Sequence, residues 1–388
     1  TFNVQTHASG SGTSDAFEPI LIRYFSNIKI RGNNFTKNGC CADDLIQILD
    51  SKNGGEISNN RAYFSGGNGI LISNFNPQTT DNNPMLIYNN NFATAYAGYV
   101  IRLTSSRAIH IYNNNIFNNA NPGGGIEGVS VTGAQGGIRI VNNIIQANNG
   151  APLVIPNNVG NITEVNFNNY FSNGPIARIN GSDYNNLNSL RGVISNNPTN
   201  DSASYNVVPG FPNVNNLTPT AKCLLGKNVG IGFDINGTAR PSTPSLGSIE
   251  PTYGTNDIGV AEILSPSFPI SAGQQDLIVR VQNYGSNNIS TADISYILNS
   301  GTPVVQNLPS ALGQCQSINI QFTGSNQINV NPGSNTLRVF TSNPNGGTDA
   351  NTSNDEINIG ICTPLNGTYS IGAGGDFASI NAAVNAIN

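Results

Sequence analysis

Short stretches of alternating apolar and polar residues recur along the first 180 residues, and each one runs into a pair of asparagines. The pattern is shared by NIKIRGNNF, ISNNRAYF, MLIYNNNF, IHIYNNNIF, IRIVNNIIQ and VNFNNYF. Their Asn pairs begin at Asn33, Asn59, Asn89, Asn113, Asn142 and Asn168, at intervals of 26, 30, 24, 29 and 26 residues. Hairpins would repeat at shorter steps, whereas one short strand per repeat at this period is typical of a solenoid. We therefore expect stacked β-coils.

The Asn pairs have a structural explanation in such a solenoid. Asn tolerates left-handed backbone geometry and hydrogen-bonds its own backbone, so each pair should turn the chain between two strands. Stacked coils would place each Asn above the next, so that the amides form a ladder along the axis. The aromatic residues that follow the turns are expected inside the coils; they are Phe35, Phe64, Phe92, Phe117 and Phe171.

Composition narrows the protein class. Of the 388 residues only 10% are charged and 37% are hydrophobic, with a formal net charge of −5. The 16 Lys and Arg residues form no basic run, so a nucleic-acid partner is not expected. No apolar stretch approaches the roughly 18 residues of a spanning helix, so membrane insertion is not expected either. Strong helix formers are sparse, which predicts an all-β protein.

The pattern changes after Asn256. Seven short alternating segments follow, separated by Gly, Pro and Asn turns: IGVAEIL, DLIVRVQN, DISYILN, PVVQN, SINIQF, NTLRVFTSN and EINIGI. This number and spacing predict an immunoglobulin-like β-sandwich over residues 256–362. Two apolar faces are expected, one formed by Leu277, Val279 and Val281 and the other by Ile318, Ile320 and Phe322.

Residues 1–250 resemble the right-handed parallel β-helix repeats of secreted and surface proteins in Bacteroidota. The most specific part is the end: DYNNLNSLRGV as a short helix, then GFDINGTARPSTPSLGSIE, which resembles the usual terminator of that group. The matching positions are Asp234, Gly237, Arg240, Gly247 and Glu250, and Ser248 replaces the usual Ala. The resemblance implies that they seal the last coil, with Arg240 paired to a carboxylate or to backbone carbonyls.

Two further segments carry a resemblance. VFTSNPNGGTDANTSND is similar to cell-adhesion-related bacterial sandwich modules, and residues 363–388 resemble the opening strand and capping helix of a following β-helix. In this tail Asp376 is the expected N-cap, and the apolar residues fall on one helix face. We expect Phe377, Ile380, Val384 and Ile387 to pack against a first coil, either of a following β-helix or of a neighbouring copy.

The sequence contains few candidate catalytic residues. Glycoside hydrolysis needs two carboxylates on one wall, and the only acids between residues 85 and 180 are Glu127 and Glu164, more than one coil apart. Asp43 and Asp44 are adjacent, so on a strand they would point to opposite faces. No catalytic residue and no cofactor are therefore predicted.

The oxygen-rich cluster Asp349, Asn351, Asn354 and Asp355 could hold calcium, or could form Asx turns that close a hairpin. No metal site is assigned. Five cysteines are present; Cys315 and Cys362 flank sandwich strands and are expected to be bridged, whereas the adjacent Cys40 and Cys41 are not expected to pair with each other.

The functional expectation is a non-enzymatic, extracellular structural and adhesive segment of a cell-surface filament or adhesin. The resemblance implies large secreted adhesins of gliding or predatory Bacteroidota exported by the type IX pathway. Expected partners are other copies of the chain, neighbouring repeats in a fibre, and glycans or prey or host surfaces. The alternative is a carbohydrate-binding or polysaccharide-degrading β-helix protein, which an exposed aromatic row would favour.

Overall fold

The computed structural model describes residues 20–37, 44–64, 67–76, 78, 83–94, 98–119, 126–194, 197, 199–267, 270–364 and 368–385. The chain divides into two compact units, Thr1–Pro251 and Thr252–Asn388, and the regular secondary structure described in both is almost entirely β-strand. The all-β prediction is therefore confirmed.

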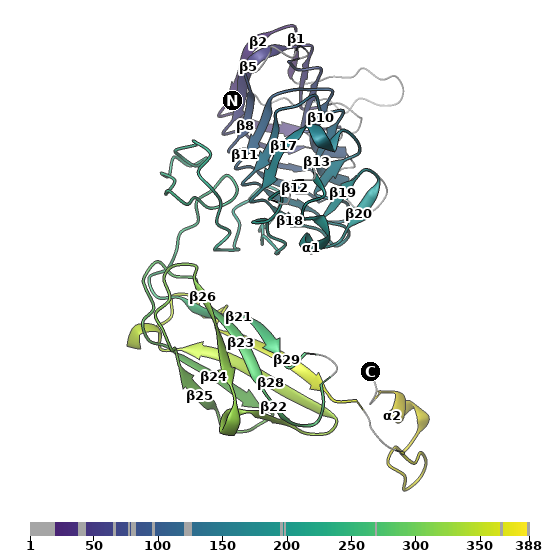
Figure 1. Cartoon of the computed structure of the whole chain (residues 1–388), viewed down its shortest axis with the longest axis vertical. Helices are drawn as coiled ribbons and strands as arrows, with labels where there is room; N and C mark the ends of the chain where they lie inside the picture. Colours follow the sequence, from purple (N-terminus) through teal and green to yellow (C-terminus); the bar gives the residue numbers. More distant parts are fainter. Residues whose placement is uncertain are drawn as a thin grey trace. The chain divides into compact units, whose positions relative to one another are not determined.

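The first unit is a solenoid whose coils contribute strands to three sheets (Figure 1). The eight-stranded sheet contains β1 (Ile20–Arg23), β4 (Ile46–Leu49), β7 (Ile70–Ser73), β10 (Gly98–Thr104), β13 (Ile126–Thr132), β16 (Leu153–Ile155), β19 (Ala177–Ile179) and β20 (Ser182–Tyr184). The second sheet contains β2 (Ser26–Arg31), β5 (Lys52–Ser58), β8 (Met85–Tyr88), β11 (Ile109–Tyr112), β14 (Ile138–Val141) and β17 (Ile162–Asn166). The third contains β3 (Asn34–Lys37), β6 (Arg61–Phe64), β9 (Asn91–Thr94), β12 (Asn115–Asn118), β15 (Ile144–Ala147) and β18 (Asn169–Phe171).

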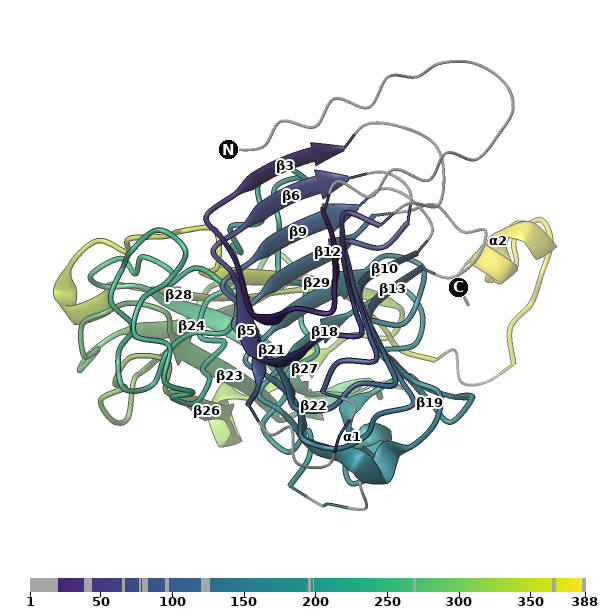
Figure 2. The ribbon, with the colours of Figure 1, turned by 90° about the horizontal axis from the view of Figure 1, so that it is seen from above.

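Parallel pairing in register stacks like residues on like residues. In the second sheet one inward column consists of Ile30, Ile57, Ile87, Ile111, Ile140 and Val165, each paired with the next and all buried. Figure 2 shows the same stacking in the third sheet, where β3, β6, β9 and β12 lie side by side. The predicted period-two alternation is confirmed, and the core of the unit is a row of aliphatic columns.

The prediction for the aromatic residues is correct in part. Phe35, Phe64 and Phe92 lie in the solenoid core. Phe117 lies on the outer face of the third sheet, where its ring centroid is 5.9 Å from that of Phe211, and Phe171 is half-buried and outside the core. Strand alternation explains the difference, because Ile116 and Tyr170 already occupy the inward positions beside them.

The last coil is closed by the segment that follows the parallel strands. β20 pairs antiparallel with β19, which ends the parallel stacking of that sheet. Helix α1 (Leu187–Leu190) begins after Asn186, whose side chain accepts a hydrogen bond from the Ser189 amide. Leu190 and Ile194 are buried in the solenoid core, so the predicted short helix is confirmed and it covers the end of the coils.

The second unit is a sandwich of antiparallel strands. One sheet contains β21 (Ile258–Ser265), β23 (Leu277–Asn283) and β26 (Ser317–Phe322), and the opposite sheet contains β25 (Val304–Asn307), β24 (Asp293–Leu298), β28 (Ser334–Ser342) and β29 (Glu356–Cys362). All seven predicted strands are present. A short ladder of β22 (Gly273–Gln275) and β27 (Ile328–Val330) was not predicted, because the first of these strands lacks apolar residues. The described 3₁₀ turns of this unit include η3 (Gly324–Asn326) and η4 (Pro344–Gly346), whereas η1 (Val159–Asn161) lies in the first unit.

The sandwich core follows the predicted faces. Leu277, Val279 and Val281 are fully buried, and Ile320 and Phe322 pack with them. The predicted bridge between Cys315 and Cys362 is wrong: Cys315 is disulfide-bonded, but Cys362 is a free, exposed thiol. The buried neighbour Ile361 points into the core, so alternation turns the side chain of Cys362 outward. Cys40 and Cys41 lie outside the described residues.

The C-terminal tail differs from its prediction. Helix α2 (Ile380–Asn385) begins after Ser379, whose hydroxyl accepts from the Ala382 amide, so Ser379 is the N-cap. Asp376 instead accepts hydrogen bonds from the amide and hydroxyl of Ser370 and closes the preceding turn. Ile380 is 71% exposed and Val384 is 45% exposed, so the face predicted to pack against a first coil is uncovered within this chain.

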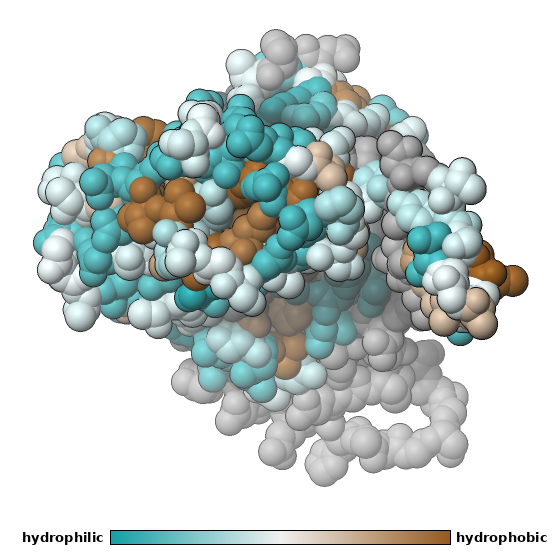
Figure 3. All heavy atoms as spheres, turned by 90° about the horizontal axis from the view of Figure 1, so that it is seen from below, coloured by the Kyte–Doolittle hydropathy of each residue, from teal (hydrophilic) through white to brown (hydrophobic). Residues whose placement is uncertain are grey.

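Phe377 of the tail is partly buried beside Tyr369, with ring centroids 5.6 Å apart, and Ile387 lies outside the described residues. The interpretation of the tail as the start of a following β-helix stays a prediction. Figure 3 shows small hydrophobic patches separated by hydrophilic surface. Among the described helices, none has the length and apolar character needed to cross a membrane.

Candidate functional site

The turn between the second and third sheets carries a continuous ladder of side-chain amides. Its members are Asn33, Asn60, Asn90, Asn114, Asn143 and Asn168. In each step the Oδ1 atom accepts from both the backbone amide and the Nδ2 group of the Asn in the preceding coil, at 2.9–3.1 Å. The predicted ladder is confirmed, and it uses one Asn of each pair.

The other Asn of the pair makes the turn. Asn59, Asn89, Asn113 and Asn142 have φ between 52° and 62°, in the left-handed region that Asn tolerates. In the first coil Gly32 takes this conformation and in the last coil Phe167 does. The left-handed residue directly precedes the ladder residue in every coil, so the ladder stays in register. The ladder residue is the second Asn of the pair in the middle coils, but it is the first Asn of the pair in the first and last coils, at Asn33 and Asn168.

The ladder ends on a buried polar cluster. The Asn168 amide donates to Ser204 Oγ at 3.1 Å, and its Nδ2 group donates to the Tyr170 hydroxyl at 3.1 Å. Both hydroxyls then donate to Asp201 Oδ1, at 2.8 Å from Ser204 and 3.1 Å from Tyr170. Burial raises the pKa of Asp201 to about 7. The Asp201 Oδ2 atom has no partner among the described residues, so the cluster favours a protonated carboxyl group.

Residues 205–250, here called the strap, run back along the outside of the coils. The left-handed Asn residues hold it: Nδ2 of Asn142 donates to the Lys227 carbonyl at 2.7 Å, and Nδ2 of Asn89 donates to the Phe233 carbonyl at 2.7 Å. Arg61, one coil earlier, donates to Asn236 Oδ1 at 2.8 Å. The expectation that this segment seals the last coil is therefore wrong. Its backbone carbonyls accept hydrogen bonds from the outward-facing turn residues Asn89 and Asn142, which belong to different coils. The strap therefore lies along several coils.

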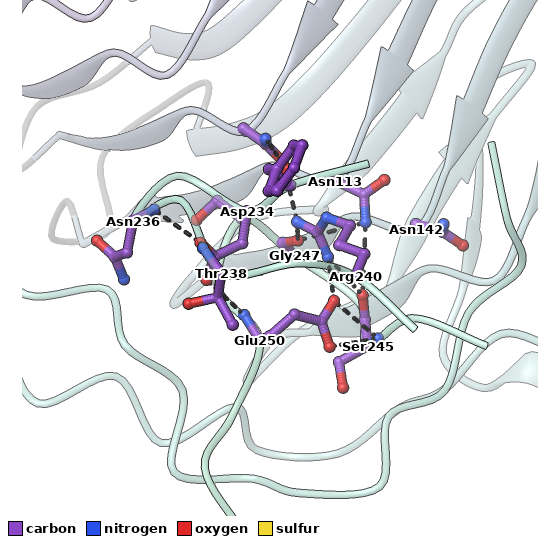
Figure 4. Close-up of polar contacts among 12 residues, drawn as sticks. Asn113, Asn142, Asp234, Asn236, Thr238, Arg240, Ser245, Gly247 and Glu250 are labelled. Atoms are coloured by element: carbon purple, nitrogen blue, oxygen red, sulfur yellow. Dashed lines mark hydrogen bonds and ion pairs between the residues drawn. The ribbon is translucent and has the colours of Figure 1, made fainter. Parts of the chain in front are cut away.

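A buried arginine lies at the centre of the strap (Figure 4). Arg240 forms an ion pair with Glu250, and their side chains are 2% and 9% exposed. The guanidinium also donates to Asn89 Oδ1 at 2.9 Å and to the Gly247 carbonyl at 2.8 Å. Burial lowers the pKa of Arg240, while the Glu250 carboxylate opposes this. The predicted pairing of Arg240 with a carboxylate and with carbonyls is confirmed.

The other motif residues shape the backbone around this pair. Asp234 Oδ1 accepts from the amides of Asn236 and Thr238, both at 2.8 Å, and its Oδ2 accepts from the Glu250 amide at 3.0 Å. Gly237 has φ 84° in the turn that these bonds close. The five motif residues therefore build one rigid turn and the buried ion pair.

Gly247 and Ser248 fit the strap against the coils. A Cβ atom on Gly247 would lie 2.0 Å from Asn115 Oδ1, and its φ is 79°, so this position requires glycine. The Ser248 amide donates to Asn115 Oδ1 at 3.2 Å, and its hydroxyl donates to Asn91 Oδ1. This hydroxyl contact gives a structural reason for serine at position 248.

The candidate acids of the coils are bound into local contacts. Glu164 pairs with Arg139 at 3.0 Å and with Lys227 of the strap. Asp44 is buried and accepts from the amide and the side chain of Asn68, at 2.9 and 2.6 Å. The Glu127 side chain and Asp43 lie outside the described residues.

The oxygen-rich cluster of the second unit contains Asx-type contacts. Asp349 Oδ1 accepts from the Asn351 amide at 2.8 Å, and its Oδ2 accepts from the Ile258 amide at 2.9 Å. Burial and the nearby Asp349 and Asp257 carboxylates raise the pKa of Asp355 to about 6. Within the part of the chain that the structure describes, no group of three His, Cys, Asp or Glu residues is arranged to hold a metal ion.

Comparisons with known proteins agree with the solenoid. Residues 18–202 match the family model described as "Right handed beta helix region". No curated protein sequence matches the chain significantly. Among solved structures, the CARDB domain of the PF1109 protein from Pyrococcus furiosus, in complex with di-metal ions, is similar at 18% identity over 30% of this chain and 94% of that domain, with a TM-score of 0.24.

A solution structure of the same CARDB domain is similar at 17% identity over 28% of this chain and 96% of that domain, with a TM-score of 0.22. The parallel coils described between Ile20 and Ile179, together with the family match over residues 18–202, identify this part of the chain as a right-handed parallel β-helix.

Proposed function

We propose that this chain is a non-enzymatic structural and adhesive segment of a cell-surface protein. The observation that carries the proposal is the use of polar side chains within the β-helix unit. The ladder Asn residues bond to one another, the left-handed Asn residues bond to the strap, and Glu164 is held between two cations. Such an arrangement serves rigidity, whereas hydrolysis of a glycosidic bond needs two carboxyl groups that face one substrate.

In this proposal the chain acts outside the cell, as part of a filament or adhesin of the Bacteroidota type exported by the type IX pathway. Its partners are other copies of the chain and the surfaces of other cells. The specific resemblance of the strap motif, from Asp234 to Glu250, supports this placement.

Two measurements on the full chain test the proposal. Beads coated with the chain should adhere to cells or glycan-coated surfaces more than bare beads, and beads coated with Arg240→Met, which disrupts the strap, should adhere less. The chain should release no product from pectin, alginate or other uronic-acid polymers. Turnover that Glu164→Gln abolishes, or adherence no greater than that of bare beads, would refute the proposal.

A further inference from the structure

A polar groove of about 410 Å³ lies between the first coils and the strap. One wall is the outer face of the third sheet at β3, β6 and β9, where Asn34, Arg61 and Asn91 are stacked in register. The other wall is formed by strap residues 214–218 together with Asn236. Its volume falls within the range of small-molecule sites.

The groove exists because the strap contacts the coils unevenly. Further along the same sheet face, Leu217 of the strap packs on Ala93 and Phe117 and fills the space between strap and sheet. At the first two coils the corresponding outer positions are Thr36 and Tyr63, which line the groove, and Tyr63 also packs against the cluster that contains Leu217. The cavity is therefore a local gap under the strap, open to small polar molecules.

The side-chain amides in the groove offer hydrogen bonds that the protein does not use. The Asn34 side chain bonds to no described residue. Asn91 and Asn216 accept through Oδ1, from Ser248 and from the Thr218 amide, but their Nδ2 groups donate to no described residue. A carboxamide both donates and accepts, which matches the hydroxyl groups of a sugar.

Two further side chains narrow the ligand class. Tyr63 is half-buried in the groove and presents both an aromatic ring and a hydroxyl group, a combination suited to a ligand with apolar and polar faces. Among the described residues that line the groove, Arg61 is the only charged one, and one of its nitrogens already donates to Asn236. The remaining guanidinium donors favour a ligand that carries a carboxylate.

We propose that this groove binds a carboxylated oligosaccharide, with its hydroxyl groups on the Asn amides, a ring face against Tyr63 and the carboxylate on Arg61. This assignment gives the adhesive role proposed above a ligand class. It depends on that role only for where the ligand would be met, not for the binding itself. The carboxylate could belong to a uronic acid or to a sialic acid, since both present the same chemistry to Arg61.

Isothermal titration of the full chain tests the assignment with two matched probe pairs: trigalacturonate against its methyl ester, and 3′-sialyllactose against lactose. At least one carboxylated probe should bind with a Kd below about 1 mM, and its neutral counterpart should bind at least about tenfold more weakly. The pair that shows this difference identifies the source of the carboxylate. No binding by either carboxylated probe, or equal binding by the neutral counterpart, would overturn the assignment.

Three variants locate the binding. Arg61→Gln should weaken it at least about tenfold, and Thr36→Trp, which fills the groove, should abolish it. Arg23→Gln is the matched control, because Arg23 is an exposed arginine on β1 outside the groove. Melting temperatures show that each variant is folded. If a folded Thr36→Trp variant still binds the carboxylated probe, the groove is not the binding site. Beads coated with this variant can still adhere to cells, so the ligand assignment can fail while the adhesive role stands.

Discussion

Arg240 and Glu250 form an ion pair that is buried within the strap, and the same guanidinium reaches Asn89 in the coils. Removing one partner of a buried pair leaves an uncompensated charge, at a cost of about 3–5 kcal/mol. We therefore expect Arg240→Met to lower the free energy of unfolding of the β-helix unit by that amount in urea denaturation.

The control for this change is Arg178→Met. Arg178 pairs with Asp183 at 2.6 Å, but both side chains are more than 40% exposed, so the expected loss is below about 1 kcal/mol. Equal losses for the two arginines would show that the strap pair does not hold the unit together.

Two of the strap glycines, Gly237 and Gly247, provide a second test, because both have a left-handed backbone but their surroundings differ. Gly237 has open space around it, so Gly237→Ala should cost only the conformational penalty of about 1–2 kcal/mol. Gly247→Ala adds a clash with Asn115 and should cost about 2–5 kcal/mol. Thermal unfolding of both variants measures the difference, and a smaller effect at Gly247 would mean that the strap is not seated on Asn115.

Variants of the Asn pair in the fourth coil compare the stability contributed by the turn residue Asn113 with that of the ladder residue Asn114. Asn114→Leu removes the acceptor for the amide and the Nδ2 group of Asn90, which leaves two buried donors unsatisfied and should cost roughly 3–5 kcal/mol. Asn113→Leu should also destabilise the fold, by a smaller amount, since it strains a left-handed residue by about 1–2 kcal/mol and loses two long contacts of 3.4 Å.

Equilibrium unfolding of the two leucine variants gives the ranking. An unchanged melting temperature for Asn113→Leu would indicate that this turn position does not require Asn. A milder effect for Asn114→Leu than for Asn113→Leu would contradict the ladder as the main polar contribution to stability.

The Asp201 cluster predicts a pH dependence. The pKa of Asp201 is about 7 in the folded chain against an ordinary value of 3.8, so between these values the unfolded state binds fewer protons. The free energy of unfolding should therefore fall as pH rises from about 4 to about 7, and the stabilisation is complete below the lower value. Asp201→Asn should remove this part of the slope.

The comparison uses the native chain and the variant at pH 5 and pH 8, because Asp355 in the sandwich, with a pKa of about 6, adds a slope of the same sign to both. The native chain should lose more stability between the two pH values than the variant does. Identical slopes would mean that Asp201 is ionised in the folded protein.

The coils could be predicted from the sequence because their burial is local. Columns such as Ile87, Ile111 and Ile140 appear as a period-two pattern within each repeat, and the Asn turns repeat at one position per coil. Phe117 was misplaced because the aromatic residue does not keep a constant distance from the ladder Asn, and only the strand register decides its face.

The path of the strap could not be predicted in the same way. Its contacts join polar side chains to backbone carbonyls, as between Asn142 and Lys227, and such pairs leave no hydrophobic period in the sequence. The motif from Asp234 to Glu250 indicated that Arg240 would be paired, but not which coils it would contact. The N-cap of α2 was misassigned because Asp376 and Ser379 are both capable caps, three residues apart.

The route of the strap has a consequence for how the unit folds. A bare solenoid has mostly neighbour contacts, so its repeats can form and fray one after another. Here Ser248 bonds to Asn91 across 157 residues and Asn236 bonds to Arg61 across 175, and such distant contacts form slowly because a long loop must close first. The strap can dock only after the coils beneath it are assembled. Once docked, it couples their opening, so that a nearest-neighbour array becomes one cooperative unit.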